Sequence, residues 1–314
     1  MLLNSNKPLV TIAIPSYNHS DYIDECIKSI IEQDYENIEL IIIDDGSIDD
    51  SLNKILKYVE NFKERFIRYE IRSNKNQGIT ATLNEAISWA KGKYFASFDS
   101  DDIMLPDKTS YLVRNMEIEN DLAGLFGGAI IIDKYSNEIL NLNPPIHYYS
   151  FEDLILRNQH FIVGPSQLLR LDALKKVGGY PNGVLIDDWY MWLKLTEIGF
   201  KLKSVPKPLF KYRRHGENIS MNSNKMYIGR LQVLNFFVTS KFYKKAKSII
   251  EVTASIDFIP ISKLTSIKRL YSSMNIDIYI ILNVKFWKAF FKIITPILIF
   301  NHLKLIVNYI KNLN

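Results

Sequence analysis

Strand-like and helix-like patterns alternate along the first hundred residues of this 314-residue chain. Short apolar runs predict strands at residues 10–15, 39–43, 66–71 and 94–98. Amphipathic segments predict helices between them, from near Tyr22, at residues 47–60 and at residues 80–90. A strand-and-helix repeat of roughly 30 residues is typical of a mostly parallel sheet with helices on both faces. We therefore expect an α/β fold.

Polar motifs directly follow three of the predicted strands. They are PSYN at residues 15–18, DDGS at residues 44–47 and DSDD at residues 99–102. In open α/β sheets, ligands bind beyond the carboxyl ends of the strands. The three motifs are therefore expected to contribute to one binding site.

The pattern changes after residue 121. Further strands are predicted at residues 124–132, 167–171, 200–205 and 209–212. Helices are predicted at residues 151–156, at residues 172–177 and from Asp187 onward. No internal repeat or low-complexity linker divides the chain.

The run from Asp99 to Asp102 is the first of two acidic clusters. Carboxylates beside an apolar strand are costly unless a cation or a protic group uses them. Asp99 and Asp101 lie two residues apart, so in extended backbone they face one side, where they could hold a divalent cation on a diphosphate. The alternative is structural, with Ser100 or Asp102 capping a helical turn that begins near residue 105.

The second cluster, Asp187 and Asp188, opens a predicted helix. A carboxylate at this place could accept the proton of an alcohol, as a general base does. Trp189 and Trp192 add apolar bulk, which predicts a raised carboxyl pKa. Both rings could also stack on the acceptor, and a core role is an equal alternative for Trp192. The alternative is an ordinary acidic first turn, favoured by the helix dipole. Taken together, the two clusters suggest group transfer from a diphosphate to a hydroxyl.

His215 and the two arginines before it have two interpretations each. His215 is either a loop residue without a role or a nitrogen ligand that completes a metal site beside Asp101. Arg213 and Arg214 either offset phosphate charge or are solvated.

Asp45 and Tyr17 also have two interpretations. Asp-Gly-Ser at residues 45–47 is a common turn sequence. In the other interpretation, the Asp45 carboxylate accepts the imide N–H of uracil and the Tyr17 ring stacks on the base.

Together these motifs resemble the family 2 inverting glycosyltransferases, which have the GT-A fold, over residues 8–220. The matching segments are TIAIPSYN (11–18), IDDGS (43–47), NQG (76–78), LN (83–84), FDSDD (98–102), GGY (178–180), DDW (187–189) and YRRH (212–215). The resemblance implies a Rossmann-like GT-A catalytic domain at residues 1–220, with a nucleotide-binding half at 1–120 and an acceptor half at 121–220. Residues 221–314 are expected to form a helical, basic extension.

The same resemblance implies transfer of a sugar from a UDP-sugar to a hydroxyl of a glycan or an undecaprenyl-diphosphate-linked glycan. A β-glycosidic bond would form by inversion, as in synthesis of bacterial O-antigen or capsule. The residues implied in donor binding are Pro15, Tyr17, Asn18, Asp45, Gly78, Asn84 and Asp99.

The implied metal ion is Mn²⁺ or Mg²⁺, bound by Asp101 and His215. Asp188 matches the position of the general base, the second residue of the family's Glu-Asp pair. Asp187 replaces the glutamate, so the base is one of these two aspartates. The family's Ala-Arg-Asn reads Thr-Leu-Asn at residues 82–84, so an arginine contact is missing here.

Charge is distributed unevenly along the chain. Residues 1–229 carry 26 Lys/Arg and 31 Asp/Glu, a net charge of −5, whereas residues 230–314 carry 13 and 3, a net charge of +10. Residues 278–314 contain no acidic residue and combine lysines with Trp and Phe. A basic amphipathic segment of this kind is typical of binding to an anionic membrane interface. The alternative is a helix packed on the catalytic domain or on a second copy in a homodimer. The expected location is the cytoplasm, at the inner face of the cell membrane.

Cys26 is the sole cysteine, so no intramolecular disulfide can form, which fits a reducing cytoplasm. Its place on an apolar helical stripe predicts a core residue. Two other functions are alternatives: a catalytically inactive nucleotide-sugar or carbohydrate-binding protein of the same fold, and a nucleotidyltransferase. The latter would carry a Gly-rich basic loop after the first strand, which PSYN is not. No nucleic-acid partner is expected.

Overall fold

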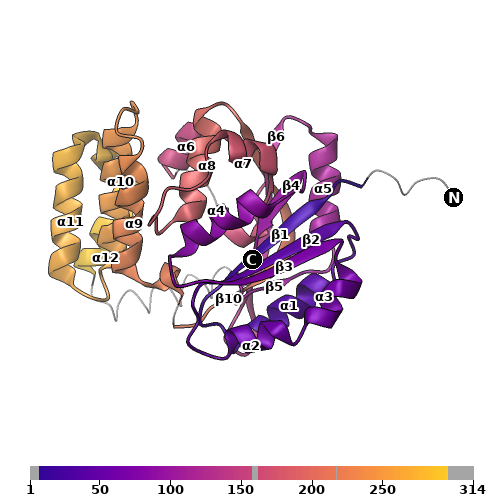
Figure 1. The fold of residues 1–314 in the computed structure, drawn as a ribbon. Helices are drawn as coiled ribbons and strands as arrows, with labels where there is room; N and C mark the ends of the chain where they lie inside the picture. The colour runs from indigo at the N-terminus through magenta and orange to yellow at the C-terminus, as the bar shows by residue number, and fades with distance from the viewer. Residues whose placement is uncertain (1–6, 158–161, 217, 296–314) are drawn as a thin grey trace, which may run out of the picture. The chain divides into compact units, whose positions relative to one another are not determined.

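The computed structural model describes residues 7–157, 162–216 and 218–295. Contacts divide the chain into two compact units, residues 1–154 with 158–218, and residues 155–157 with 219–314. We refer to them as the first and the second unit. Figure 1 shows the sheet in the first unit and helices in the second.

The described strands of the first unit form one sheet in the order β3-β2-β1-β4-β9-β6-β10-β5, with β7 on β6 and β8 on β10. The parallel pairs join β1 (Val10–Ser16), β2 (Ile38–Asp44), β3 (Arg68–Ser73) and β4 (Tyr94–Ser97), and also β6 (Leu122–Ile132) with β10 (Lys201–Arg213). The antiparallel strands are β5 (Ile103–Met104), β7 (Glu138–Leu142), β8 (His147–Tyr149) and β9 (Leu168–Arg170).

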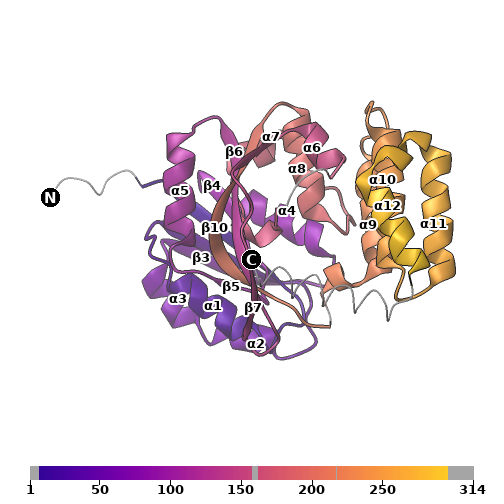
Figure 2. The same cartoon turned by 180° about the vertical axis from the view of Figure 1, so that it is seen from behind.

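Helices cover both faces of the parallel strands, as Figures 1 and 2 show. These helices are α1 (Ile23–Ile31), α2 (Ser51–Leu56), α3 (Val59–Arg65) and α4 (Ile79–Trp89). Because successive strand residues point to opposite faces, Ile12 and Ile14 share a core with Cys26 of α1, while Ala13 faces α4. The predicted α/β fold is confirmed, and Cys26 is a buried core residue as expected.

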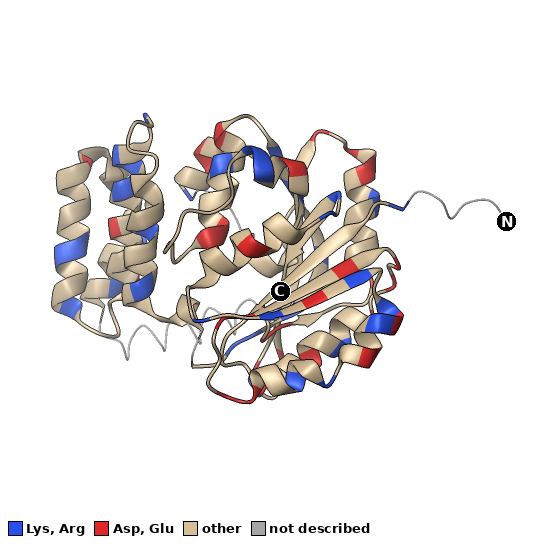
Figure 3. Ribbon diagram, in the orientation of Figure 1, with Lys and Arg blue, Asp and Glu red and all other residues tan. Residues whose placement is uncertain are grey.

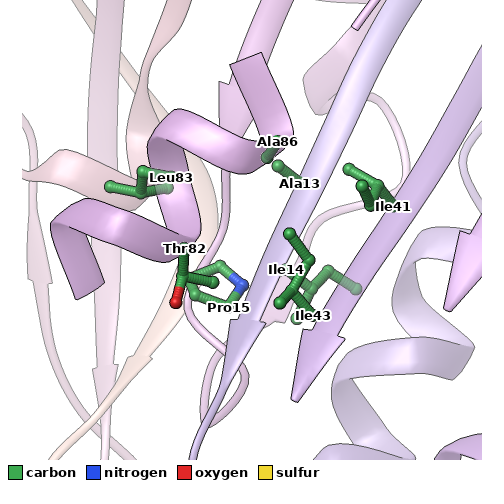
Figure 4. A pocket seen from close by; sticks show the side chains of 8 residues that line it. All are labelled: Ala13, Ile14, Pro15, Ile41, Ile43, Thr82, Leu83 and Ala86. Carbon is green, nitrogen blue, oxygen red and sulfur yellow. The ribbon is translucent and has the colours of Figure 1, made fainter. Parts of the chain in front are cut away.

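Figure 4 shows a small pocket between α4 and the sheet. It is too narrow for a water molecule, and its lining residues are Ala13, Ile14, Pro15, Ile41, Ile43, Thr82, Leu83 and Ala86. This packing holds the N-terminus of α4, and with it Gly78, at the carboxyl ends of β1 and β2.

The remaining helices of the first unit are α5 (Lys108–Ile118), α6 (Phe151–Ile155), α7 (Leu171–Lys176) and α8 (Asp187–Glu197). The helix predicted at residues 47–60 is two helices, α2 and α3. The two strands predicted at 200–205 and 209–212 are one strand, β10, with register shifts between Ser204 and Pro208. Prolines cannot donate to the ladder, and a bulge lets the strand continue past them.

The second unit contains α9 (Ser223–Asn235), α10 (Tyr243–Asp257), α11 (Lys263–Ile276) and α12 (Val284–Ile294). The side chains of Asn222, Ser262 and Asn283 cap the N-termini of α9, α11 and α12. Tyr227 donates to Glu251 at 2.8 Å and accepts from Arg269 at 2.6 Å, which joins three helices. The predicted helical extension is confirmed for the described residues.

Candidate active site

The carboxyl ends of β1, β2 and β4 meet at one edge of the sheet. Ser16 is in register with Asp44, and Ala13 with Ser97. The loop after β1 is held by the loop after β2: the Asn18 N–H donates to Ser47 Oγ, and Asn18 Oδ1 accepts from the Ile48 N–H, both at 2.9 Å. Tyr17 stands out from this loop with 45% of its surface exposed. The PSYN and DDGS motifs therefore lie together.

Asp45 connects the DDGS motif to the start of α4. Its carboxylate accepts from the N–H groups of Gln77 at 2.9 Å and Gly78 at 2.8 Å. Gly78 has φ +87°, a conformation that suits glycine. A carboxylate has about four lone-pair positions, so Asp45 keeps acceptor capacity for a base. The structure thus brings Tyr17, Asp45 and Gly78 together.

Asn84 of α4 is engaged with the loop that leads to α8. Its Oδ1 accepts from the Tyr180 N–H at 2.8 Å, and its Nδ2 donates to the Tyr180 carbonyl at 2.7 Å. Gly179 has φ +72°, and a Cβ there would lie 2.5 Å from Asn84 Oδ1. In this structure the amide of Asn84 therefore positions the Gly-Gly-Tyr loop.

Asp102 and Arg213 tie the end of β10 to the acidic turn. Asp102 Oδ1 accepts from the Arg213 N–H at 2.8 Å, and Arg213 Nε donates to the Asp101 carbonyl at 2.8 Å. Arg213 is 1% exposed and also pairs with Glu25. Burial and the charges of Asp101 and Asp99 raise the pKa of Asp102 well above its ordinary value.

These contacts correct two sequence interpretations. Asp102 and Ser100 do not cap a helix: the N-cap residue of α5 is Asp107, and Ser100 Oγ lies 2.7 Å from His19 Nδ1. Arg213 is neither solvated nor directed at a phosphate, because its guanidinium is buried against protein acceptors. Arg214 is exposed.

Asp101 and His215 meet beyond the end of β4. His215 Nε2 lies 2.8 Å from Asp101 Oδ2, and Asn218 Nδ2 lies 3.3 Å from the same oxygen. Burial by itself raises the pKa of Asp101, but the hydrogen bond from His215 and the nearby imidazoles bring it below its ordinary value. Two ligand atoms at right angles around an ion at 2.1 Å are about 3.0 Å apart. The donor pair therefore fits a divalent metal ion.

Asp187 and Asp188 begin α8 and act electrostatically on the acidic turn. The pKa of Asp99 is raised well above its ordinary value by burial, then by the charges of Asp101, Asp187 and Asp188. Burial and the charge of Asp188 raise the pKa of Asp187 to about 7. The two acidic clusters, distant in sequence, therefore lie within electrostatic reach of each other.

The surroundings of the aspartate pair differ from the expectation. Trp189 is 5% and Trp192 6% exposed, and their Nε1 atoms donate to the Leu154 carbonyl and to Gln167 Oε1. Both rings are core residues, so neither stacks on a sugar here. Gly164 leaves space beside the pair, since a Cβ there would lie 3.2 Å from Asp188 Oδ2.

One residue of the site escaped the sequence reasoning. His19 follows the PSYN motif directly, and one of its ring nitrogens lies within 4.8 Å of ligand atoms of both Asp101 and His215. The one sequence feature that could have indicated a role for His19 is its position directly after a polar motif at the end of a strand.

Comparison with known proteins gives one family throughout. The family model described as "Glycosyl transferase family 2" matches residues 11–178. A Haemophilus influenzae protein described as an uncharacterized glycosyltransferase is 31% identical over 299 residues, which cover 82% of this chain and 90% of that protein. The Escherichia coli chondroitin synthase is 34% identical over 217 residues, covering 68% of this chain and 30% of the synthase.

Solved structures resemble the fold at low identity. The mannosyltransferase PcManGT from Pyrobaculum calidifontis, in complex with GDP-Man and Mn²⁺, gives a TM-score of 0.62 at 16% identity and covers 86% of this chain and 76% of that one. S. aureus TarS in complex with UDP-GlcNAc gives a TM-score of 0.57 at 14% identity, and the match covers 85% of this chain and 81% of the TarS chain. These likenesses confirm the predicted GT-A fold.

Proposed function

The chain belongs to glycosyl transferase family 2, and we propose that it is a metal-dependent, inverting enzyme that moves a sugar from a UDP-sugar to a hydroxyl of a glycan or lipid-linked glycan. The observation that carries this proposal is the placement of two acidic clusters at one site, with Asp101 beside His215 in the first and Asp187 beside Asp188 in the second. Catalysis is assigned to residues 1–220.

The donor is assigned to the edge formed by β1, β2 and β4. Tyr17 has an exposed ring that can stack on uracil, with Pro15 and Asn18 shaping its loop. Asp45 would accept the imide N–H while its bonds to the following loop hold it in place. Asp99 would contact the ribose. S. aureus TarS was solved with UDP-GlcNAc, which is consistent with a UDP-sugar.

Asp101 and His215 would hold the divalent cation. When bound, that cation would neutralise negative charge on the departing diphosphate. Arg213 and Asp102 keep the two ligands in register by fixing the strand that carries His215 to the turn that carries Asp101. PcManGT was solved with Mn²⁺, which is consistent with such a centre.

Asp188 is assigned as the general base. It would accept the proton of the acceptor hydroxyl while that oxygen attacks the anomeric carbon opposite the diphosphate. The bond from carbon to the diphosphate oxygen breaks, the diphosphate leaves with the electron pair, and the configuration inverts. Burial and the charge of Asp188 raise the pKa of Asp187 to about 7, so Asp187 holds a proton below that pH.

The relatives support a glycan acceptor. The proteins named chondroitin synthase and hyaluronan synthase each match more than two thirds of this chain. We assign a glycan acceptor of bacterial surface polysaccharide, O-antigen or capsule, carried on a lipid diphosphate.

A panel of nucleotides and nucleotide sugars tests this function. UDP-sugars with Mn²⁺ are expected to raise the Tm, with GDP-sugars giving a smaller shift, since binding to the native state stabilises it. Slow donor hydrolysis or transfer to a glycan should accompany the best binder. Binding without either reaction would favour the inactive binding protein, and absence of UDP binding would contradict the donor assignment.

The second unit is assigned to the membrane surface through one face of α12. Phe286, Ala289 and Ile293 are buried, whereas Trp287 and Phe291 are 46% and 57% exposed. Lys288 is exposed beside these rings, and Figure 3 shows few acidic residues in this unit. Exposed aromatics flanked by lysines are typical of helices that lie in an anionic interface. Among the described residues, none of the helices is long and apolar enough to cross a bilayer.

Replacing Trp287 and Phe291 together by alanine is expected to reduce binding to anionic vesicles tenfold or more, since burial of each large apolar side chain contributes about 1.5–3 kcal/mol. Deletion of residues 278–314 is a poorer test because Phe286 and Ile293 belong to the core of the unit. Co-sedimentation measures the effect, with Tyr135→Ala as an exposed-aromatic control in the first unit. If the full chain does not co-sediment with anionic vesicles, the membrane assignment is wrong, and the alternative is that this face of α12 packs against protein.

A further inference from the structure

His19 lies against the assigned metal centre from a third direction. Its ring centroid is 6.0 Å from that of His215, with the two rings nearly perpendicular at 87°. Single ligand atoms of His19, Asp101 and His215 all lie within 4.8 Å of one another. The three side chains come from the loop after β1, the turn after β4 and the segment after β10. This is the convergence that a mononuclear metal centre requires.

Hydrogen bonds fix both the backbone N–H and the carbonyl of His19. Its N–H donates to Ser51 Oγ at 2.9 Å, and its carbonyl accepts from the N–H groups of Tyr22 and Ile23 at the start of α1. The ring is fixed as well, because Nδ1 lies 2.7 Å from Ser100 Oγ. Metal-binding histidines usually donate their second nitrogen in this way, which leaves the lone pair on the other nitrogen.

We infer that His19 is a third protein ligand, so that the centre consists of two imidazoles and one carboxylate. This inference rests on the proposed metal dependence and adds one residue to it. The competing acidic trio of Asp99, Asp101 and Asp102 is less suitable. One oxygen of Asp102 is already engaged, because it accepts from the Arg213 N–H at 2.8 Å.

Two nitrogen ligands determine which ion the centre selects. Imidazole suits divalent transition-metal ions, whereas Mg²⁺ binds oxygen ligands and keeps most of its water. The centre is therefore expected to prefer Mn²⁺ over Mg²⁺ more strongly than a site built from carboxylates alone. The identity of the ligands and the preference for one ion can both be measured without enzymatic turnover.

Pulsed EPR on Mn²⁺ bound to the full chain, with and without UDP, counts the coordinated nitrogens directly. We expect modulation from two histidine nitrogens in the unmodified protein, and a changed pattern after selective ¹⁵N-histidine labelling. His19→Gln and His215→Gln should each retain one nitrogen, and His147→Gln, a histidine of β8, should retain both. Mn²⁺ affinity should fall about tenfold or more in His19→Gln, the scale set by loss of supporting ligands. The preference for Mn²⁺ over Mg²⁺ should fall with it.

The outcomes separate this inference from the proposed function. One nitrogen in the unmodified protein, unchanged in His19→Gln, overturns the third ligand and leaves the metal dependence standing. A His19→Gln variant that binds Mn²⁺ normally but UDP weakly would make His19 a phosphate contact and would also overturn it. No saturable Mn²⁺ binding in any form overturns both. The count in the unmodified protein decides the matter even if a variant does not fold.

Discussion

Asp188→Asn is expected to lower sugar transfer by a factor of roughly 10² or more while donor affinity stays unchanged, which is the scale of general-base removal. The substitution keeps the shape and removes the charge and the basicity. Asp188 lies at the start of α8, next to Asp187 and within electrostatic reach of Asp99. Its Oδ1 already accepts from the Trp189 N–H, and an asparagine oxygen can keep that bond. Transfer rates and UDP-sugar binding, measured on the same preparation, check the result.

Asp187→Asn is the matched control, because it makes the same chemical change one residue away. A folded pKa of about 7 lies above the ordinary value of 3.8, so folding binds a proton between these pH values and stability falls as pH rises through that window. The control should therefore melt at a higher temperature than the unmodified protein at pH 8 and at a similar temperature near pH 4. It should retain transfer. If it is inactive and Asp188→Asn is active, the roles are reversed.

The order of elements in the first unit could be predicted because most of its strands contain an apolar run. In β2, where every residue is buried, residues 40–43 form such a run, and the neighbouring helix α1 has one apolar stripe. Exact boundaries were less predictable where tertiary contacts decide them. The helix predicted from near Tyr22 starts at Ile23, and the loop before it is tied to the loop after β2 by the Ser20 N–H, which donates to Asp49 Oδ2. β10 continues through two prolines because β6 lies beside it.

The site could be predicted as a set of motifs but not as a set of contacts. The family pattern predicts that Asp101 and His215 lie together, and in the structure Asp101 Oδ2 is 2.8 Å from His215 Nε2. The burial of Arg213 could not be predicted from its sequence neighbours, because its partners Glu25 and Asp101 are distant in the sequence. His19 was missed for the same reason: only the folded sheet brings the loop after β1 to the turn after β4.

Asp101→Asn is expected to abolish the effect of Mn²⁺ on UDP-sugar binding and to reduce transfer to background. The carboxylate is the charged member of the assigned metal centre and is 6% exposed. The amide oxygen can still accept from His215 and thus preserve the local fold, whereas the negative charge that attracts the cation is lost. Calorimetry of UDP binding with and without Mn²⁺ measures the difference.

Asp121→Asn makes the same substitution at an exposed ion pair with Lys201, where a loss of about 0–1 kcal/mol is expected. That control should show the same dependence on Mn²⁺ as the unmodified protein. Asp101→Asn should also remove the nitrogen modulation from bound Mn²⁺, because the two imidazoles alone offer no charge to hold the ion. UDP affinity that is equal with and without Mn²⁺ in the unmodified protein would contradict the metal assignment. A variant that keeps its Mn²⁺ response would move the ion to other carboxylates, of which Asp99 is the nearest in the turn.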